Sequence, residues 1–378
     1  MSAEWTFLVY MAADNNLERM ALSDLEEMAK GVSGNAVNVV VEIDTHKSQR
    51  MKRLRIHRGV AEVLADGPGI DTGDPARLTE FIDWGLDTFP ARYSALVIFD
   101  HGGGWEDPRV DPLAFRRPRP SNPIVRHEIA DDFTSKDYLT DQELLLAVAK
   151  TKRGRVDVFA CDACLMAMLE IAYEMRETCS FMVASEDIVG KQTRWDYRSI
   201  LRALSDEPWM SPRSLAAKSV TLYGERYEGK DIGRAAMSAV ETQNLEPLAL
   251  ALDDWATNLT HLLKGERDNI GAARQQVLGF GDGKVGYLDL GDLVTKVTEA
   301  IQDDKLTASG HRLRKALGHA VSQNWAYDGK GAHATGLSVF FPNAPDDLYS
   351  YGRLALSKKH RWGGFLRAYF ASPPASAP

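Results

Sequence analysis

Short apolar runs that alternate with amphipathic helical stretches constrain the fold of this 378-residue chain more than any other feature. The runs at residues 5–12, 37–44 and 97–99 have the length and composition of buried strands, and two more follow at residues 156–160 and 181–185. Repeated strand–helix alternation is typical of a mostly parallel sheet covered by helices on both faces. We therefore predict an α/β fold of three layers with a mostly parallel central sheet.

Local signals predict where several elements begin and end. Residues 51–66 have the pattern of a β-hairpin. Asp74 is a helix cap with Pro75 in the first helical position, and Thr140 with Glu143 forms a capping box ahead of another helix. These signals support the alternation in the first half of the chain.

Beyond about residue 205 the pattern shifts toward helices, with a short apolar strand at residues 336–343. No glycine- and serine-rich linker separates the two halves, and the last residues, ASPPASAP, are poor in apolar side chains. Three amphipathic stretches lie near residues 213–226, 245–264 and 290–320. We predict a catalytic core over 1–205, a helix-rich C-terminal subdomain packed on it over 206–370, and a disordered tail over 371–378.

Charge and cysteine content exclude several functional classes. The net charge of −8 and the pI of about 5.7 disfavour binding to nucleic acid or to an anionic membrane. Three cysteines do not make a disulfide framework, which favours a reducing compartment. The first residues lack a basic stretch before an apolar run, and no run of about 18 apolar residues occurs. We therefore expect a cytoplasmic protein, and nothing in the composition indicates its oligomeric state.

Two reactive side chains follow consecutive apolar runs. His101 comes directly after the run at residues 97–99, and Cys164 follows the run at residues 156–160. Because parallel strands end at the same edge of a sheet, a thiol and an imidazole far apart in sequence become neighbours. This pairing predicts a nucleophile and its base. We expect a following helix to lower the pKa of the thiol, and the amides of Gly102 and Cys164 to hold an oxyanion.

Acidic residues near the candidate nucleophile predict a cationic substrate. Asp162 lies two residues before Cys164, so in an extended segment both project to the same side. A buried carboxylate there binds a guanidinium or ammonium group, although capping of the next helix is the alternative. Glu186 and Asp187, just past the following strand, are secondary candidates for the pocket rim, and Trp195 is a candidate for its wall.

A set of motifs is distributed along the chain, densely over residues 5–200 and patchily afterwards: AADNNLE at 12–18, DHGGGW at 100–105, DDFTSKDYLTDQEL at 131–144, DACLM at 162–166, ASED at 184–187, WDY at 195–197 and GLSVFFP at 336–342. As an ordered set these motifs resemble the clostripain family of cysteine peptidases. That resemblance implies a caspase/gingipain/legumain-like fold, a His/Cys dyad and cleavage after basic residues. It makes His101 the base, Cys164 the nucleophile and Asp162 the residue that selects Arg or Lys.

The resemblance also implies self-cleavage in the segment between the histidine and the cysteine. Here that segment, residues 105–138, is rich in Arg and Pro. Arg117 and Arg119 precede prolines, so Arg116 and Arg126 are the better candidates for the cut. The alternative interpretation is a solvated basic loop.

No motif predicts a metal or a cofactor. Some clostripain-like enzymes depend on calcium, but this chain has no EF-hand spacing. Asp14, Glu42 and Asp44 lie at the ends of the first two strands, where we interpret them as polar strand ends rather than as an ion site. We therefore predict no metal and no cofactor, and calcium dependence is left open because no sequence motif supports or excludes it.

The sequence supports one function and leaves two alternatives open. The first prediction is a cysteine endopeptidase that acts on peptides and proteins after Arg or Lys. The second is a caspase-fold pseudoprotease or scaffold that binds a protein partner with the same surface. The third is a thiol redox protein, since Cys161 and Cys164 form a C-x-x-C motif between a strand and a helix.

Overall fold

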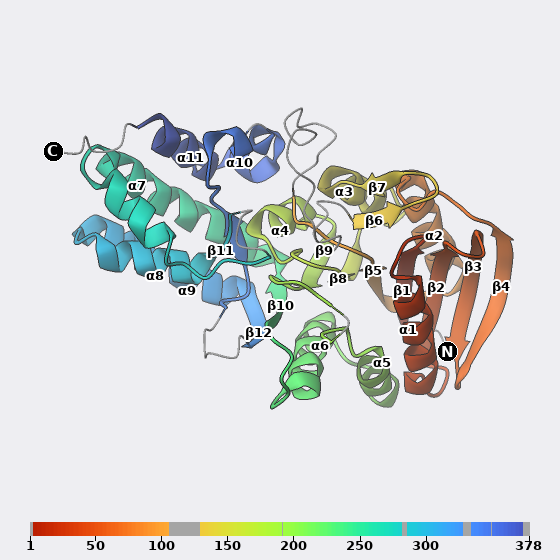
Figure 1. Cartoon of the computed structure of the whole chain (residues 1–378). Helices are drawn as coiled ribbons and strands as arrows, with labels where there is room; N and C mark the ends of the chain where they lie inside the picture. The colour runs from red at the N-terminus through yellow and green to blue at the C-terminus, as the bar shows by residue number, and fades with distance from the viewer. Residues whose placement is uncertain are drawn as a thin grey trace.

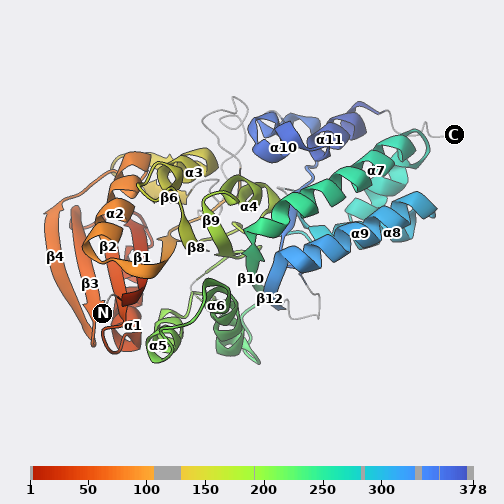
Figure 2. The same cartoon turned by 180° about the vertical axis from the view of Figure 1, so that it is seen from behind.

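One large sheet organises the computed structural model of this protein (Figures 1 and 2). The structure describes residues 3–105, 129–190, 192–281, 286–327, 334–348 and 350–372. Within these residues nine strands form the sheet, in the order β12-β10-β9-β8-β5-β1-β2-β3-β4. The strands are β1 (Ala3–Ala13), β2 (Val37–Thr45), β3 (Arg50–His57), β4 (Val60–Pro68), β5 (Ala91–Phe99), β8 (Val156–Asp162), β9 (Cys179–Ala184), β10 (Ala235–Glu241) and β12 (Val321–Tyr327).

The centre of the sheet is parallel and its edges are antiparallel. Strands β2, β1, β5, β8 and β9 pair in parallel, whereas β3 and β4 extend one edge and β10 and β12 the other in antiparallel pairs. The central strands are buried along nearly their whole length, because helices cover both faces. The predicted α/β class with a mostly parallel sheet is thereby confirmed.

Each face of the sheet has its own apolar core. On one face α1, α5 and α6 pack through residues such as Met28, Leu201 and Val220. On the other, α2, α3 and α4 pack through residues such as Phe81 and Leu144, in a core that continues into the C-terminal helices. The helices are α1 (Glu18–Gly31), α2 (Pro75–Thr88), α3 (Asp141–Ala149), α4 (Leu169–Met175), α5 (Tyr197–Asp206), α6 (Pro212–Tyr227), α7 (Leu245–Arg274), α8 (Leu290–Ala300), α9 (Asp304–Ala320), α10 (Ala355–Lys359) and α11 (Trp362–Ala371).

The predicted local signals are present. The hairpin is β3–β4, and the Asp74 side chain accepts a hydrogen bond from the Ala76 amide at the start of α2. Thr140 and Glu143 form the expected capping box of α3. The stretch at residues 290–320 is two helices rather than one, because Asp303 caps a new helix through the Leu306 amide.

The C-terminal half contributes to the same sheet. Strands β10 and β12 lie beyond residue 205, so the sheet crosses the predicted domain boundary, and that division stays a prediction. Helices α7 to α11 gather at this end of the molecule (Figure 1). Helix α11 includes Ala371, the first residue of the predicted tail, and residues 373–378 lie outside the described part. Short elements complete the chain: β6 (Ile129–Asp132), β7 (Asp137–Leu139), β11 (Tyr287–Asp289), β13 (Ser338–Phe340), and the 3-10 turns η2 (Thr242–Asn244), η3 (Pro345–Leu348) and η4 (Tyr351–Arg353).

The described helices do not have the properties of membrane spans. Among the described helices, α7 is the longest with 30 residues, and neither it nor any other combines the length and the apolar character that a bilayer crossing requires.

Candidate active site

His101 and Cys164 lie past the ends of two neighbouring parallel strands. Strands β5 and β8 pair in a register that places Phe99 opposite Asp162. The chain therefore leaves both strands at the same edge of the sheet, as ligand sites of parallel sheets require. Both side chains are buried, with 3% of His101 and 2% of Cys164 exposed.

The glycine after His101 touches the backbone of Cys164. A Cβ atom at Gly102 would lie 2.3 Å from the carbonyl oxygen of Cys164 and 2.9 Å from its nitrogen. Only glycine allows the two loops to approach this closely. The same glycine run is covered by the C-terminal half, since the Tyr287 hydroxyl donates a 2.9 Å hydrogen bond to the Gly103 carbonyl.

The turn between β1 and α1 orients His101. The Nε2 atom of His101 lies 2.7 Å from Oδ1 of Asn16, a hydrogen bond that requires a proton on Nε2. The neighbouring Asn15 side chain donates to Asp100 at 2.7 Å and to the Asp131 carbonyl at 2.8 Å, which fixes the turn to the segment that carries His101. Asn16 was not singled out from the sequence, although it lies in the motif AADNNLE.

The Cys164 thiol is held by the backbone of Val189. The Val189 amide donates to Sγ at 3.2 Å, and the Val189 carbonyl lies 3.4 Å from Sγ as an acceptor for the thiol proton. Burial raises the pKa of the Cys164 thiol to about 12. The described thiol is therefore protonated at neutral pH.

The expectation that a helix begins at Cys164 is wrong. Helix α4 begins at Leu169, and the intervening backbone turns at Leu165, whose φ is 61°. Instead of starting a helix, this loop bonds to the segment after β9, with the Leu165 amide donating to the Asp187 carbonyl and the Ala167 amide to the Ser185 carbonyl. In the described part of the chain, no helix begins at Cys164 to offset the burial of the thiol.

Asp162 ends β8 as a buried carboxyl group. It is 4% exposed, and within the described residues its Oδ2 atom has no hydrogen-bond partner. Burial, and after it the negative charge of Asp24, raises the pKa of Asp162 to about 8. Hydrogen bonds from the Tyr197 hydroxyl and the Trp195 backbone amide stabilise the carboxylate and oppose this rise. Trp195, the predicted wall, thus lies beside Asp162, and the late start of α4 leaves Asp162 no helix to cap.

Glu186 and Asp187, the candidates for the pocket rim, contact residues of the C-terminal half of the chain. Glu186 is 1% exposed and accepts a 3.0 Å hydrogen bond from the Gly336 amide. Asp187 forms a 2.9 Å ion pair with Arg234. These contacts anchor the segment that carries Val189. Arg116 and Arg126, the candidates for self-cleavage, lie outside the described residues.

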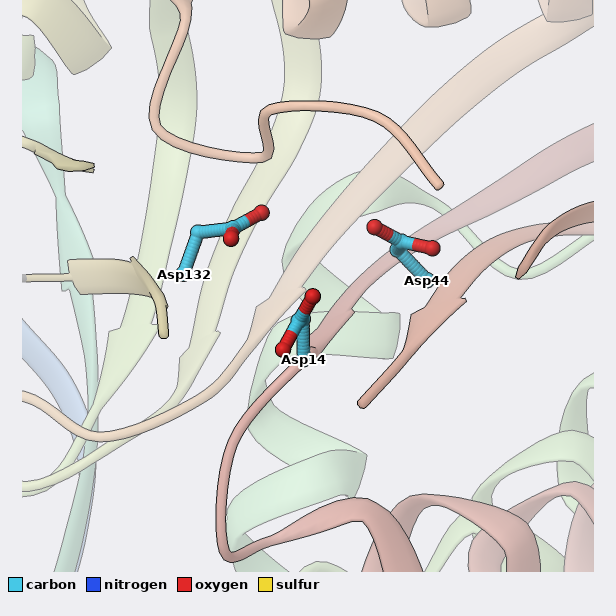
Figure 3. A group of neighbouring side chains, drawn as sticks. All are labelled: Asp14, Asp44 and Asp132. Atoms are coloured by element: carbon cyan, nitrogen blue, oxygen red, sulfur yellow. The ribbon is translucent and has the colours of Figure 1, made fainter. Parts of the chain in front are cut away.

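Three buried carboxylates gather near the ends of β1 and β2 (Figure 3). One oxygen from each of Asp14, Asp44 and Asp132 lies within 4.8 Å of the others, the one such group of potential metal ligands in the described part of the chain. Oxygen ligands of this kind suit calcium. However, Asp44 accepts from the Thr45 and Ile70 amides, and Asp132 likewise accepts from Thr72 and Ser135.

These bonds explain the arrangement of the three carboxylates without an ion. Burial and the charges of Asp132 and Asp14 raise the pKa of Asp44 to about 6, although two backbone amides oppose this rise. Glu42, which we had grouped with Asp14 and Asp44, pairs instead with Arg53 at 2.6 Å. We therefore assign no metal to this cluster, and a metal-free protein stays a prediction.

Comparisons with known proteins converge on one family. The chain matches the sequence model of the clostripain family over residues 9–355. It is 29% identical over 220 residues to clostripain from Hathewaya histolytica, an alignment that covers 49% of this chain and 39% of clostripain. The chain thus spans well under half the length of this curated relative.

Two solved structures share the fold over nearly the whole chain. One is an inactive zymogen of a C11 protease from Parabacteroides distasonis, with a TM-score of 0.72 and 17% identity, covering 95% of this chain and 98% of that one. The other is a secreted C11 cysteine protease from Bacteroides thetaiotaomicron in complex with an irreversible peptide inhibitor. Its TM-score is 0.69 at 19% identity, covering 97% and 99% of the two chains.

The contact between Gly102 and Cys164 predicts that Gly102→Ala is destabilising. The new methyl group meets backbone atoms that cannot move aside, so we expect the free energy of unfolding to fall by about 1–3 kcal/mol in a urea titration. Gly364→Ala, in α11, is the matched control, because a Cβ there meets nothing within 4 Å. Equal stability of the Gly102→Ala variant and the wild type would show that the two loops are not in contact.

Proposed function

The chain belongs to the clostripain family of cysteine peptidases, and from this premise we propose that it is an endopeptidase that cuts peptides after Arg or Lys. The observation that carries the proposal is the β5–β8 register, which brings His101 and Cys164 to one edge of the sheet beside the buried Asp162. Clostripain itself, the curated relative, supports the peptidase class.

The proposed reaction uses Cys164 and His101 in turn. His101 accepts the thiol proton, and the Cys164 thiolate attacks the scissile carbonyl carbon to form a tetrahedral oxyanion. We place that oxyanion near the amides of Gly102 and Cys164, whose backbones touch. The intermediate collapses to a thioester as His101 protonates the leaving amine. Water, deprotonated by His101, then hydrolyses the thioester and restores the thiol.

The described conformation corresponds to a resting form in this proposal. Attack on a carbonyl needs a thiolate, but the Cys164 thiol is buried, and its pKa is raised to about 12. The Val189 carbonyl accepts the thiol proton, so the proton must pass to His101 and the backbone at Val189 must shift before the sulfur attacks. Substrate binding is the event that we expect to drive this shift.

Self-cleavage after Arg116 or Arg126 belongs to the same proposal. Its support is the Arg-rich composition of residues 105–138. Trp105, at the start of that segment, is buried against Phe340 and Tyr351, and Ile129 begins β6. The described residues on either side of Arg116 and Arg126 are therefore anchored to the rest of the protein. One solved C11 relative, from Parabacteroides distasonis, is an inactive zymogen.

The redox alternative has little support from the geometry. Cys161 is fully buried within β8, and burial raises its pKa well above the usual value. A redox cysteine needs a low pKa and access to solvent. An assay of peptide cleavage decides between a peptidase and a pseudoprotease.

Peptidase activity is tested with fluorogenic peptides that carry Arg, Lys, Asp or leucine before the reporter. We expect turnover of the Arg and Lys peptides alone, its loss in Cys164→Ala and His101→Ala, and fragments on a gel only when Cys164 is intact. Cys161→Ser should retain turnover, because the fully buried Cys161 takes no part in the reaction. A folded wild-type protein that cleaves none of the four peptides would favour the scaffold interpretation.

Asp162 predicts a pH-dependent preference for basic substrates. A substrate cation binds the ionised carboxylate, and this form grows as the pH rises toward the raised pKa of about 8. The KM for the Arg peptide should therefore fall between about pH 6 and pH 8, while that for a norleucine peptide stays constant. Asp162→Asn should lower kcat/KM for the Arg peptide by about a hundredfold or more and remove the pH dependence. An Asp162→Asn variant that keeps the Arg preference would place the pocket elsewhere.

A further inference from the structure

A second buried carboxyl group lies near Asp162. Asp24, on α1, is 2% exposed, and its Oδ1 atom accepts a 2.9 Å hydrogen bond from Nη1 of Arg194. Its Oδ2 atom is buried and has no hydrogen-bond partner within the described residues, as is true of Oδ2 of Asp162. The two carboxyl groups are close enough for the charge of Asp24 to raise the pKa of Asp162. Two orphaned carboxylate oxygens in one region call for a cation.

Polar groups without partners surround the same region. The indole nitrogen of Trp195 is buried and has no hydrogen-bond partner among the described residues, whereas the buried hydroxyl of Tyr197 faces Asp162. Both belong to the segment that begins with Arg194. That segment is fixed from α6, where the Tyr227 hydroxyl donates to the Arg194 carbonyl at 2.6 Å. The site is therefore built from rigid elements, with several polar atoms that lack partners.

The titratable groups here include more acids than bases. Arg194 pairs with Asp24, and Arg226 pairs with Asp196 at 3.0 Å. Asp162 is the acid left over, and no ion pair with it occurs in the described part of the chain. The remaining neighbour on α1, Glu27, is paired with Lys30 at the surface. A basic side chain of a substrate would balance the charge of the group.

One segment of the chain connects Asp24 and its partner Arg194 to the thiol of Cys164. Val189 contacts the Cys164 sulfur, and the Gly190 amide donates to the Thr193 hydroxyl at 2.8 Å. Arg194 follows directly, and its side chain is 20% exposed, so the guanidinium lies at the boundary between solvent and the buried acids. The segment that holds the Cys164 sulfur at Val189 thus leads directly to Arg194, the partner of Asp24.

We propose that Asp24 is a second acidic specificity residue, which holds the guanidinium or ammonium group of the substrate together with Asp162, and that Arg194 neutralises Asp24 in the free protein. This inference rests on the proposed function, because it assigns the substrate side chain to the same pocket. The substrate cation either displaces Arg194 from Asp24 or binds Asp24 together with Arg194. Asp24 then contributes to binding of Arg and Lys peptides and not of neutral ones.

The test compares full-length variants on peptides that differ only in Arg, Lys or norleucine before the cleaved bond. We expect Asp24→Asn to raise the KM for the Arg and Lys peptides by about tenfold or more, with norleucine unchanged. Glu27→Gln is the matched control, because Glu27 lies one turn away on α1, is 26% exposed and pairs with Lys30, and it should behave as wild type. Arg194→Met should lower the KM for the Lys peptide and the inhibition constant of benzamidine several-fold, because it removes the competing cation.

A double variant separates direct contact from an indirect role. If Asp24 only keeps Arg194 away from Asp162, then Asp24→Asn/Arg194→Met will regain the wild-type preference for Arg, which overturns the inference. If Asp24 holds the substrate, the double variant will remain impaired on basic peptides. Should Asp24→Asn fail to fold, an unchanged benzamidine constant in Arg194→Met would contradict the inference by itself.

Failure of this inference differs from failure of the proposed function. When wild type prefers Arg and Asp162→Asn loses the preference, an Asp24→Asn variant that keeps it overturns only the role of Asp24. A wild type without any preference for Arg or Lys overturns the proposed specificity and, with it, this inference.

Discussion

The parallel pairing of β5 with β8 is the constraint on which the site depends. It places Phe99 beside Asp162, so the segments that carry His101 and Cys164 start from the same edge. The contact between Gly102 and the Cys164 backbone then sets how closely they approach. Every other feature of the site, from the Asn16 bond to the Val189 contact, is attached to these two segments.

Burial explains why the thiol of the site keeps its proton, and it also underlies the selectivity that we propose for basic substrates. Out of water, a thiol keeps its proton and a carboxyl group resists ionisation, so neither Cys164 nor Asp162 is charged in the way that catalysis requires until a partner arrives. In the proposed function, a basic substrate supplies that partner for Asp162. The same low-dielectric surroundings that penalise an unpaired carboxylate strengthen its pairing with a guanidinium. A resting protein with a protonated thiol is thus compatible with a selective enzyme.

Strand periodicity and turn chemistry were sufficient to predict the parallel centre of the sheet, the caps of two helices and the placement of His101 and Cys164 at one edge of the sheet. They did not predict β10 and β12, whose sequences AAMSAVE and VSQNWAY are small or polar and lack a strong strand pattern. They also placed a helix at Cys164, because the apolar spacing from Leu165 onward does not reveal the backbone turn at that residue. Asn16, Asp24 and Val189 act through contacts between distant segments, for which a single sequence carries no local signal.

The most direct test of the paired thiol and imidazole is covalent labelling with an arginine-bearing peptide chloromethyl ketone, followed by mass spectrometry of the digested protein. The account predicts one adduct, on Cys164, formed more slowly when benzamidine is present and not formed at an appreciable rate in His101→Ala. An adduct on Cys161 or Cys179, or labelling of Cys164 that does not depend on His101, would contradict it.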